Sequence, residues 1–406
     1  MELPKGFRFA GVACGIKSRQ GALDLTLIVA DNECTAAGVY TTNQVVAAPV
    51  VLSRSRTPSQ QFRGIVVNSG NANACTGAKG MTDALEMSKL AASAVADKKL
   101  AGTTAAHEDQ WIVMSTGIIG RFLPMDKIAN GIRQAAAELA TGEHAYLNAA
   151  DGIMTTDIAR KIASRQVKLP SGKSISIVGM AKGAGMIGPK MATMLGCLIT
   201  DATFGADQAQ RLLQQSADRS FNCISVEGHT STNDSLVLLA TKPTSDQPGL
   251  DESDEAVFSV ALTELCIELA KKIPDDGEGA THLIEITIRG ASSDADADRI
   301  ARSVALSNLV KTAITGGDPN WGRIVSAVGY AGVPIKPEVL SLHLNGFHLF
   351  DRGEPLEFEA KAVSQSIRGQ KLTEIELLVG YGRGTAKHWT TDLNAEYVRF
   401  NSEYST

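Results

Sequence analysis

The stretch KGAGMIGPKMATML (residues 182–195) poses the main question of this sequence. Gly183, Gly185 and Gly188 match the pattern G-x-G-x-x-G, and the apolar run SISIVGMA comes just before them. A dinucleotide-binding loop needs a helix directly after the glycines, because the helix N-terminus meets the pyrophosphate. Here Pro189 follows the last glycine, and the next residues, TMLGCLITDA, are typical of a buried strand. The nucleotide interpretation is therefore weak, and a plain turn fits the spacing better.

Thr193 gives the same stretch a third interpretation. An internal threonine hydroxyl is a poor nucleophile, but the α-amine of an N-terminal threonine, with an ordinary pKa of about 7.7–8.0, can accept the hydroxyl proton near neutral pH. A glycine-rich approach that ends in Ala192-Thr193 at the start of a buried strand is what self-cleavage between these residues requires. Taken alone, the pattern is equally typical of an ordinary capped strand.

The composition argues against several classes of protein. The chain has 406 residues, 44% of them hydrophobic, which is enough for a large core and two domains. Its 39 basic and 44 acidic residues are interspersed, so we expect neither a nucleic-acid partner nor an anionic membrane. No apolar run approaches the roughly 18 residues of a membrane span, and a secretory layout is absent from the N-terminus. The six cysteines form no C-x-x-C pair, which favours reduced thiols in a cytoplasmic protein over a zinc site.

Strand-like and helix-like segments alternate along the chain. Apolar runs predict strands near residues 25, 49, 64 and 111, and helical spacing predicts helices over residues 82–96, 124–140, 206–221, 252–272 and 294–313. Residues 166–181 predict a hairpin that turns at Pro170-Ser171-Gly172. Strands in clusters, with helices between them, predict a layered α/β sandwich. The pattern changes near residues 275–282, where we expect a domain boundary.

Ten segments, in order along the whole chain, resemble one family. With the stretch quoted above they are PKGFRFAGVACGIK (from residue 4), AAGVYTTNQVVAAPV (36), VVNSGNANACTG (66), STGIIGRFLPMDKI (115), DGIMTTD (151), STNDSLVLLA (231), DDGEGAT (275), GDPNWGRI (317) and YVRFNSEYST (397). They closely resemble segments of the ornithine acetyltransferase, or glutamate N-acetyltransferase, family of arginine biosynthesis.

The resemblance implies a fold and an assembly. Residues 1–278 would form a four-layer αββα sandwich like that of N-terminal-nucleophile hydrolases, an α/β (α+β) fold. Residues 279–406 would form a smaller C-terminal α+β domain that completes the substrate site. Cleavage after Ala192 would yield fragments 1–192 and 193–406, and two cleaved pairs would form a heterotetramer in the cytoplasm. The resemblance implies no metal and no organic cofactor, although some members also accept acetyl-CoA as donor.

The resemblance also implies an activity. N-acetylornithine would acylate the hydroxyl of Thr193, ornithine would leave, and glutamate would take the acetyl group in a ping-pong reaction. Thr116 and Gly117 match the family's oxyanion-hole pair, which would stabilise the tetrahedral intermediate. Without the resemblance, the STG at residues 115–117 is more typical of a turn at the end of a strand.

The remaining site residues are expected to contact the amino-acid substrates. Lys182 matches a substrate-binding lysine that suits an α-carboxylate, whereas the plain interpretation is a solvated loop lysine. Glu278 matches a substrate-binding carboxylate that suits the ornithine ammonium, and the neighbouring Asp275 and Asp276 stay open as alternatives. Further contacts implied by the resemblance are Thr155 or Thr156, Thr193, Asn401 and the terminal Thr406.

Two residues depart from the family pattern. Ile158 stands where a third threonine is expected, and His229 stands where an aspartate is expected in EGHTSTND. A histidine near the nucleophile suggests a general base, but the α-amine already fills that role, so a packing or solvent-facing position is favoured. Asn320, Trp321 and Arg323 look functional in composition, yet a helix start at a domain junction explains them better.

Two other functions stay open from the sequence. The first is an N-terminal-nucleophile aminopeptidase or amidase of related fold, in which water replaces glutamate as acyl acceptor. The second is a non-catalytic protein that keeps the fold, binds a metabolite of the arginine pathway and remains uncleaved. Lys182, Glu278 and the C-terminal Asn401 favour an amino-acid acceptor, and the Ala192-Thr193 pair argues against the non-catalytic alternative.

Overall fold

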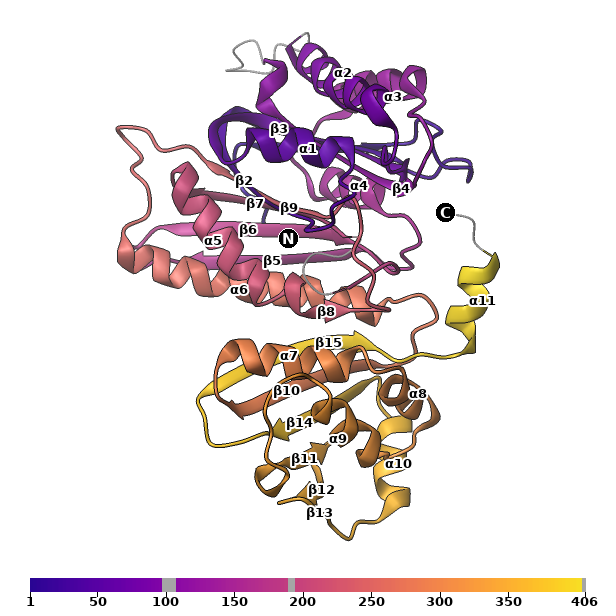
Figure 1. Cartoon of the computed structure of the whole chain (residues 1–406). Coiled ribbons are helices and arrows are strands. Elements are labelled where there is room, and N and C mark those ends of the chain that lie inside the picture. The colour runs from indigo at the N-terminus through magenta and orange to yellow at the C-terminus, as the bar shows by residue number, and fades with distance from the viewer. Residues whose placement is uncertain (97–106, 189–193, 404–406) are drawn as a thin grey trace.

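A computed structural model describes residues 1–96, 107–188 and 194–403. Their strands form two sheets, which lie one above the other in Figure 1. The first sheet has the order β4-β3-β2-β9-β7-β6-β5, with β1 paired to β2. Its strands are β1 (Phe7–Val12), β2 (Leu25–Tyr40), β3 (Ser59–Asn71), β4 (Trp111–Ile118), β5 (Lys161–Lys168), β6 (Ser174–Lys182), β7 (Leu195–Thr203) and β9 (Ser235–Thr241).

The long strand β2 folds the first sheet into two stacked halves. Its first part pairs with β1, its last part pairs with β9, and the register against β3 shifts between Val29 and Cys34. Neighbouring residues in a strand point to opposite faces, so Leu27 and Ile28 enter two different hydrophobic cores, as do Ile177 and Val178 on the other half. Each half is therefore covered on both faces.

The helices complete four layers. On one outer face of the stacked halves, α2 (Gly77–Ala96) and α3 (Met125–Glu138) pack on β1–β4. On the opposite outer face, α5 (Ala206–Asp218) and α6 (Glu252–Asp275) pack on β6, β7 and β9. The middle core lies between the two halves and includes residues of α4 (Glu143–Ile153). The predicted αββα sandwich is the observed arrangement (Figure 1).

The second sheet forms the smaller unit. Its order is β13 (Glu354–Pro355), β12 (Phe347–Asp351), β11 (Ser341–Leu344), β14 (Leu372–Leu378), β10 (Leu283–Ala291), β15 (Gly384–Thr391) and β8 (Ile224–Ser225). Its core includes residues of α7 (Asp294–Ala305), α9 (Trp321–Gly329) and α10 (Ala360–Arg368). The short strand β8 belongs to the first unit by its place in the chain, but it pairs with β15 of the second unit. The second sheet therefore contains a strand from each unit. The boundary between residues 278 and 279 stays a prediction.

Several predicted elements are confirmed and others differ. The hairpin of β5 and β6, the helix α6 and the helix start at Asn320, which caps α9, are as expected. The run near residue 49 is not a strand but α1 (Ala48–Arg56), because Pro49 suits a first helical turn and one face is buried. The helix predicted over 294–313 is two helices, since Ser307 accepts a hydrogen bond from the Val310 amide and caps α8 (Asn308–Gly316).

One predicted helix starts earlier than expected. The helix predicted from residue 82 already begins at Gly77, and the Thr82 hydroxyl bonds a carbonyl inside the helix instead of capping it.

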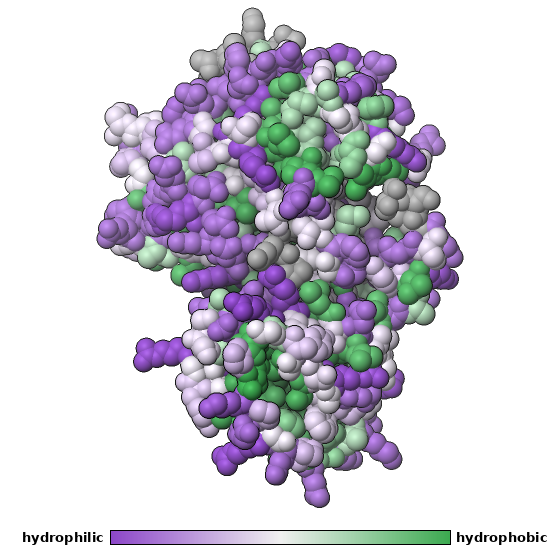
Figure 2. Space-filling model, in the orientation of Figure 1, coloured by the Kyte–Doolittle hydropathy of each residue, from purple (hydrophilic) through white to green (hydrophobic). Residues whose placement is uncertain are grey.

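On the face shown in Figure 2, hydrophobic residues gather in separate patches over both units, with hydrophilic residues between them. No helix within the described ranges is both long and apolar enough to cross a membrane.

Candidate active site

A cavity of about 150 Å³ brings together the predicted site residues that the structure describes. They come from the end of β4, the loop after α4, the end of β6, the loop after α6 and α11 (Ala395–Glu403): Thr116, Gly117, Thr155, Thr156, Lys182, Glu278 and Asn401. The other predicted residues, Ala192, Thr193 and Thr406, lie outside the described residues. Segments up to 285 positions apart in sequence, from Thr116 to Asn401, therefore meet at one place.

The end of β4 can approach its neighbour closely because Gly117 has no side chain. Its φ is +130°, and a Cβ there would lie 2.3 Å from the carbonyl carbon of Gly70 on β3. Such a position excludes every residue but glycine. Thr116 beside it is buried, with an exposed fraction of 2%, so this strand end holds a fixed hydroxyl and a tight backbone turn at the cavity.

Lys182 at the end of β6 is buried, so the solvated-lysine interpretation is wrong. Its exposed fraction is 2%, and its Nζ donates a hydrogen bond to the Thr116 hydroxyl at 3.3 Å. Burial lowers the pKa of Lys182, and the positive charge of Lys161 acts in the same direction. The carboxylates of Asp157, Asp234 and Glu278 oppose this shift. A buried cation next to a fixed hydroxyl suits an anionic group of a ligand.

Glu278 is the acidic residue of its loop that lines the cavity. Its amide donates a hydrogen bond to the Ala184 carbonyl at 3.0 Å, and its carboxylate accepts one from the Asn401 side chain at 3.1 Å. A Cβ on Gly185 would lie 2.3 Å from Oε2 of Glu278, so the missing side chain makes room for this carboxylate.

The two neighbouring aspartates are engaged elsewhere. Asp275 pairs with Lys371 at 2.8 Å, and Asp276 pairs with the buried Lys161 at 2.6 Å. Neither lines the cavity. The structure thus separates Glu278 from the two residues that the sequence could not distinguish from it.

Thr155 and Thr156 both line the cavity, so neither is favoured by position alone. The Thr155 amide donates a hydrogen bond to Asp157 at 2.9 Å, which fixes the backbone of this loop. Ile158 points elsewhere: its side chain is 85% exposed and does not line the cavity. His229 is likewise absent from the lining; its ring is exposed and its Nδ1 lies 3.6 Å from Oε1 of Glu227. A solvent-facing position is therefore the better interpretation of His229.

Sequence reasoning assigned no role to Ser231, Thr232 and Asn233, which also line the cavity. The Asn233 side chain donates to the Ser115 carbonyl at 2.9 Å and to the Ala72 carbonyl at 2.6 Å, and so ties this segment to β4. The available signal was a run of hydroxyl and amide residues directly before the buried strand β9.

Asp234 follows these residues and is fully buried. Its Oδ1 accepts a hydrogen bond from the Met194 amide at 3.1 Å, and the side chains of Ser231 and Thr41 also favour its charged form. Burial raises the pKa of Asp234 to about 8. The buried position directly before β9 thus favours the protonated form of this carboxyl group.

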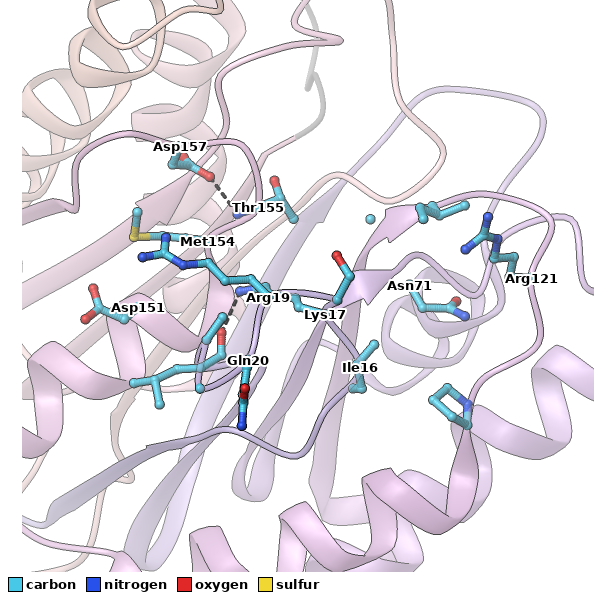
Figure 3. A pocket seen from close by; sticks show the side chains of 18 of the residues that line it. Ile16, Lys17, Arg19, Gln20, Asn71, Arg121, Asp151, Met154, Thr155 and Asp157 are labelled. Carbon is cyan, nitrogen blue, oxygen red and sulfur yellow. Dashed lines mark hydrogen bonds between the residues drawn. The ribbon is translucent and has the colours of Figure 1, made fainter. Parts of the chain in front are cut away.

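A larger cavity of about 760 Å³ lies beside the first and shares Gly117 and Thr155 with it (Figure 3). Three cations line it, namely Lys17, Arg19 and Arg121. Of its two carboxylates, Asp151 pairs with Arg160 at 2.7 Å and Asp157 with Lys161 at 2.7 Å. The cations thus outweigh the carboxylates.

Elsewhere, tertiary folding brings one histidine into a group that could hold a metal ion. Donor atoms of Cys223, Asp298 and His388 lie within 4.8 Å of one another, although the sequence shows no ligand spacing. Asp298 already bonds His388 at 2.8 Å and Arg302 at 3.1 Å, and none of the group lines the 150 Å³ cavity.

Comparison with known proteins decides the family. The family model named ArgJ matches residues 8–406. The chain belongs to the ArgJ family. A curated ArgJ relative from Rhodopirellula baltica, named arginine biosynthesis bifunctional protein, is 50% identical over 406 residues, covering 100% of this chain and 96% of the relative. The predicted family is confirmed, and membership of the ArgJ family supports the acyltransferase interpretation over the aminopeptidase alternative.

Two solved structures complete the comparison. Ornithine acetyltransferase from Mycobacterium tuberculosis, complexed with ornithine, is 41% identical to this ArgJ chain, covers 46% of it and 92% of its own chain, and has a TM-score of 0.42. An aminopeptidase from Ochrobactrum anthropi, described as a variant of the Ntn hydrolase fold, is 13% identical, covers 68% of this chain and 85% of its own, and has a TM-score of 0.43.

Proposed function

We propose that this chain is a self-processing N-acetyltransferase of arginine biosynthesis that moves acetyl from N-acetylornithine to glutamate. Membership of the ArgJ family supports the activity. The observation that carries the site is the convergence of seven predicted residues, from five separate segments, on the 150 Å³ cavity.

The proposed reaction begins with self-cleavage: the Thr193 hydroxyl attacks the Ala192 carbonyl, the peptide C–N bond breaks to leave an ester, and water hydrolyses that ester to free the α-amine and the hydroxyl of Thr193. The freed α-amine of Thr193 takes the proton of its hydroxyl, the hydroxyl oxygen attacks the acetyl carbonyl of N-acetylornithine, and the amide C–N bond breaks. The proton passes to the departing amine of ornithine. The amine of glutamate then attacks the acetyl ester, and the hydroxyl of Thr193 is restored. Thr116 and Gly117 would stabilise the oxyanion in both steps.

The cavity carries one positive and one negative side chain, and each suits a different group of the substrates. The buried ammonium of Lys182 suits the α-carboxylate that ornithine and glutamate share. The carboxylate of Glu278, positioned by Asn401, suits the side-chain ammonium of ornithine. A charge-assisted hydrogen bond of this kind contributes about 1.5–3 kcal/mol.

We also propose a cytoplasmic enzyme that forms a heterotetramer of two cleaved pairs and needs no metal or organic cofactor. Free cysteines, found at all six positions, support a reducing compartment.

A second activity, the use of acetyl-CoA as donor, is favoured by the 760 Å³ cavity. Its cations suit phosphate groups, and its shared wall at Gly117 would bring an acyl group near the predicted oxyanion hole. We expect Arg19→Ala and Arg121→Ala to weaken the acetyl-CoA reaction and to leave transfer from acetylornithine unchanged.

Mass spectrometry of the intact protein after incubation with N-acetylornithine tests the main proposal. We expect two fragments, with an acetyl group on the one that begins at Thr193, and neither cleavage nor acetyl in Thr193→Ala. A chain that stays whole would favour the non-catalytic alternative. A cleaved chain that releases acetate to water, with no acetylglutamate formed, would favour the amidase.

A further inference from the structure

Three buried charges lie directly behind the candidate active site. The ammonium of Lys161, at the start of β5, contacts Asp157 Oδ1 at 2.7 Å and Asp276 Oδ2 at 2.6 Å. The side chains of Lys161, Asp157 and Asp276 are 1%, 0% and 12% exposed. We call these three residues the Lys161 triad. None of the three lines the 150 Å³ cavity, although Asp157 lines the neighbouring 760 Å³ cavity.

Each carboxylate of the triad also binds the backbone of a segment that supplies the cavity. Asp157 accepts hydrogen bonds from the amides of Thr155 at 2.9 Å and Gly183 at 2.7 Å, the second being the residue after Lys182. Figure 3 shows the first of these bonds at the edge of the neighbouring cavity. Two segments that carry predicted substrate contacts thus bind one carboxylate.

Asp276 brings in the third segment. It precedes Glu278 by two residues and accepts hydrogen bonds from the amides of Ile158 at 3.0 Å and Ala159 at 3.3 Å. The Lys161 ammonium joins the two carboxylates, so the loop of Thr155, the end of β6 and the loop of Glu278 share one anchor.

We propose that the Lys161 triad consists of positioning residues, which set the distance between the cation and the carboxylate that bind the amino-acid substrate. This inference rests on the proposed function. The binding groups lie on separate segments, so a small shift of one segment would misplace its group relative to the other. A buried ion network is itself weak evidence of stability, because desolvation offsets much of the attraction.

The triad also acts on Lys182 through its charge. Of its members, Asp157 favours the charged form of that buried lysine, whereas the positive charge of Lys161 opposes it. Lys161 and Lys182 hold the pKa of Asp157 down at about 2, against the effect of burial, and Asp157 in turn raises the pKa of Lys182. Removing the charge of Asp157 would therefore favour the neutral amine of Lys182, which binds a carboxylate poorly.

Steady-state kinetics of Lys161→Met, Asp157→Asn and Asp276→Asn test the proposal, with rates normalised to the fraction that begins at Thr193. We expect KM for N-acetylornithine to rise at least tenfold while kcat falls less. Lys161→Arg should recover most of the loss. In Asp157→Asn, the alkaline limb of kcat/KM should move to lower pH.

Glu285→Gln is the matched control. Glu285 is a partly buried carboxylate of the second sheet that bonds Lys271 at 3.0 Å, Lys387 at 2.6 Å and Trp389 at 2.8 Å. We expect it to lower the melting temperature without changing KM. If the triad variants also changed only the melting temperature, the proposal would be overturned.

Two further results separate a folding defect, or a failure of the proposed function, from a failure of the role of the triad. Should Lys161→Met and Asp157→Asn fail to fold, the less buried Asp276→Asn decides by the same change in KM. If the wild-type protein forms no acetyl adduct, the proposed function fails, whereas an active wild type with an unchanged KM in Asp276→Asn overturns only the role of the triad.

Discussion

Asn401, in the last described helix of the chain, donates a hydrogen bond from its side chain to the carboxylate of Glu278, 3.1 Å away and 123 residues earlier in the sequence. The same amide also donates to the Tyr397 carbonyl at 3.0 Å within α11. This contact places the C-terminal helix against the loop after α6, at the rim of the 150 Å³ cavity. It links the end of the chain to the one carboxylate of the DDGEGA loop that faces the cavity.

We expect Glu278→Gln to raise KM for N-acetylornithine about 10- to 100-fold. The reason is that the hydrogen bond between the substrate ammonium and residue 278 would lose the negative charge of its acceptor. The measurement is steady-state kinetics with acetylornithine as varied substrate. Asp275→Asn is the control, since Asp275 pairs with Lys371 at the surface and should change KM little. Equal effects of the two substitutions would contradict the assignment of Glu278.

Asn401→Ala should raise KM about fivefold, the effect of one hydrogen bond of about 1 kcal/mol, and should leave the melting temperature unchanged. The second expectation follows because no residue of α11 is buried. Ser402→Ala is a matched control on the same helix, since its hydroxyl bonds the Arg399 carbonyl within that helix. A lower melting temperature in Asn401→Ala would show that α11 supports the fold rather than the ligand.

Thr116→Val should lower kcat about 10²- to 10³-fold, because the fixed hydroxyl would be lost from the proposed oxyanion hole. Thr116→Ser keeps the hydroxyl that accepts from Lys182 and should keep most of kcat. Single-turnover acetylation of the fragment that begins at Thr193 measures the step directly. Similar rates for the valine and serine variants would remove the Thr116 side chain from the oxyanion hole and leave backbone amides in that role.

Asp234→Asn should reduce the pH dependence of stability. Burial raises the pKa of Asp234 to about 8, against roughly 3.9 in an unfolded chain. The folded state therefore binds a proton that the unfolded state has lost, so the free energy of unfolding falls as pH rises from about 4 to 8. An asparagine resembles the protonated carboxyl and removes this contribution.

Melting temperatures from pH 5 to pH 9, measured in a Thr193→Ala background so that both proteins are compared as one chain, check the expectation. The difference between the Asp234→Asn variant and its parent should grow in favour of the variant with rising pH. Parallel curves would mean that Asp234 is ionised throughout this range in the folded protein.

Much of the fold was predictable where local chemistry decides it. The hairpin of β5 and β6 follows from alternating apolar residues around Pro170-Ser171-Gly172, and α9 follows from Asn320 at its start. The prediction failed at α1, because a short apolar run with a proline suits both a strand and a helix until its buried face is known. It also missed the break at Ser307, since a serine inside a helical pattern is ambiguous without its hydrogen bond.

The candidate site divides in the same way. The resemblance to the family indicated Thr116, Lys182 and Glu278, because family motifs are short stretches of local sequence. They could not show that Asp276 turns inward to Lys161 while Glu278 faces the cavity, because that choice depends on a lysine 115 positions away.

The sequence by itself determined the family, the class of chemistry and the type of substrate, since these follow from family motifs, in which the order of side chains along the chain is local. Tertiary structure alone decided which of them meet. The strand β2 joins the two stacked halves of the first sheet, because its first part pairs with β1 and β3 and its last part with β9, and β8 ties the second sheet to the first unit. Charges distant in sequence then become neighbours in a buried environment, where burial and pairing set their protonation and so what they can bind.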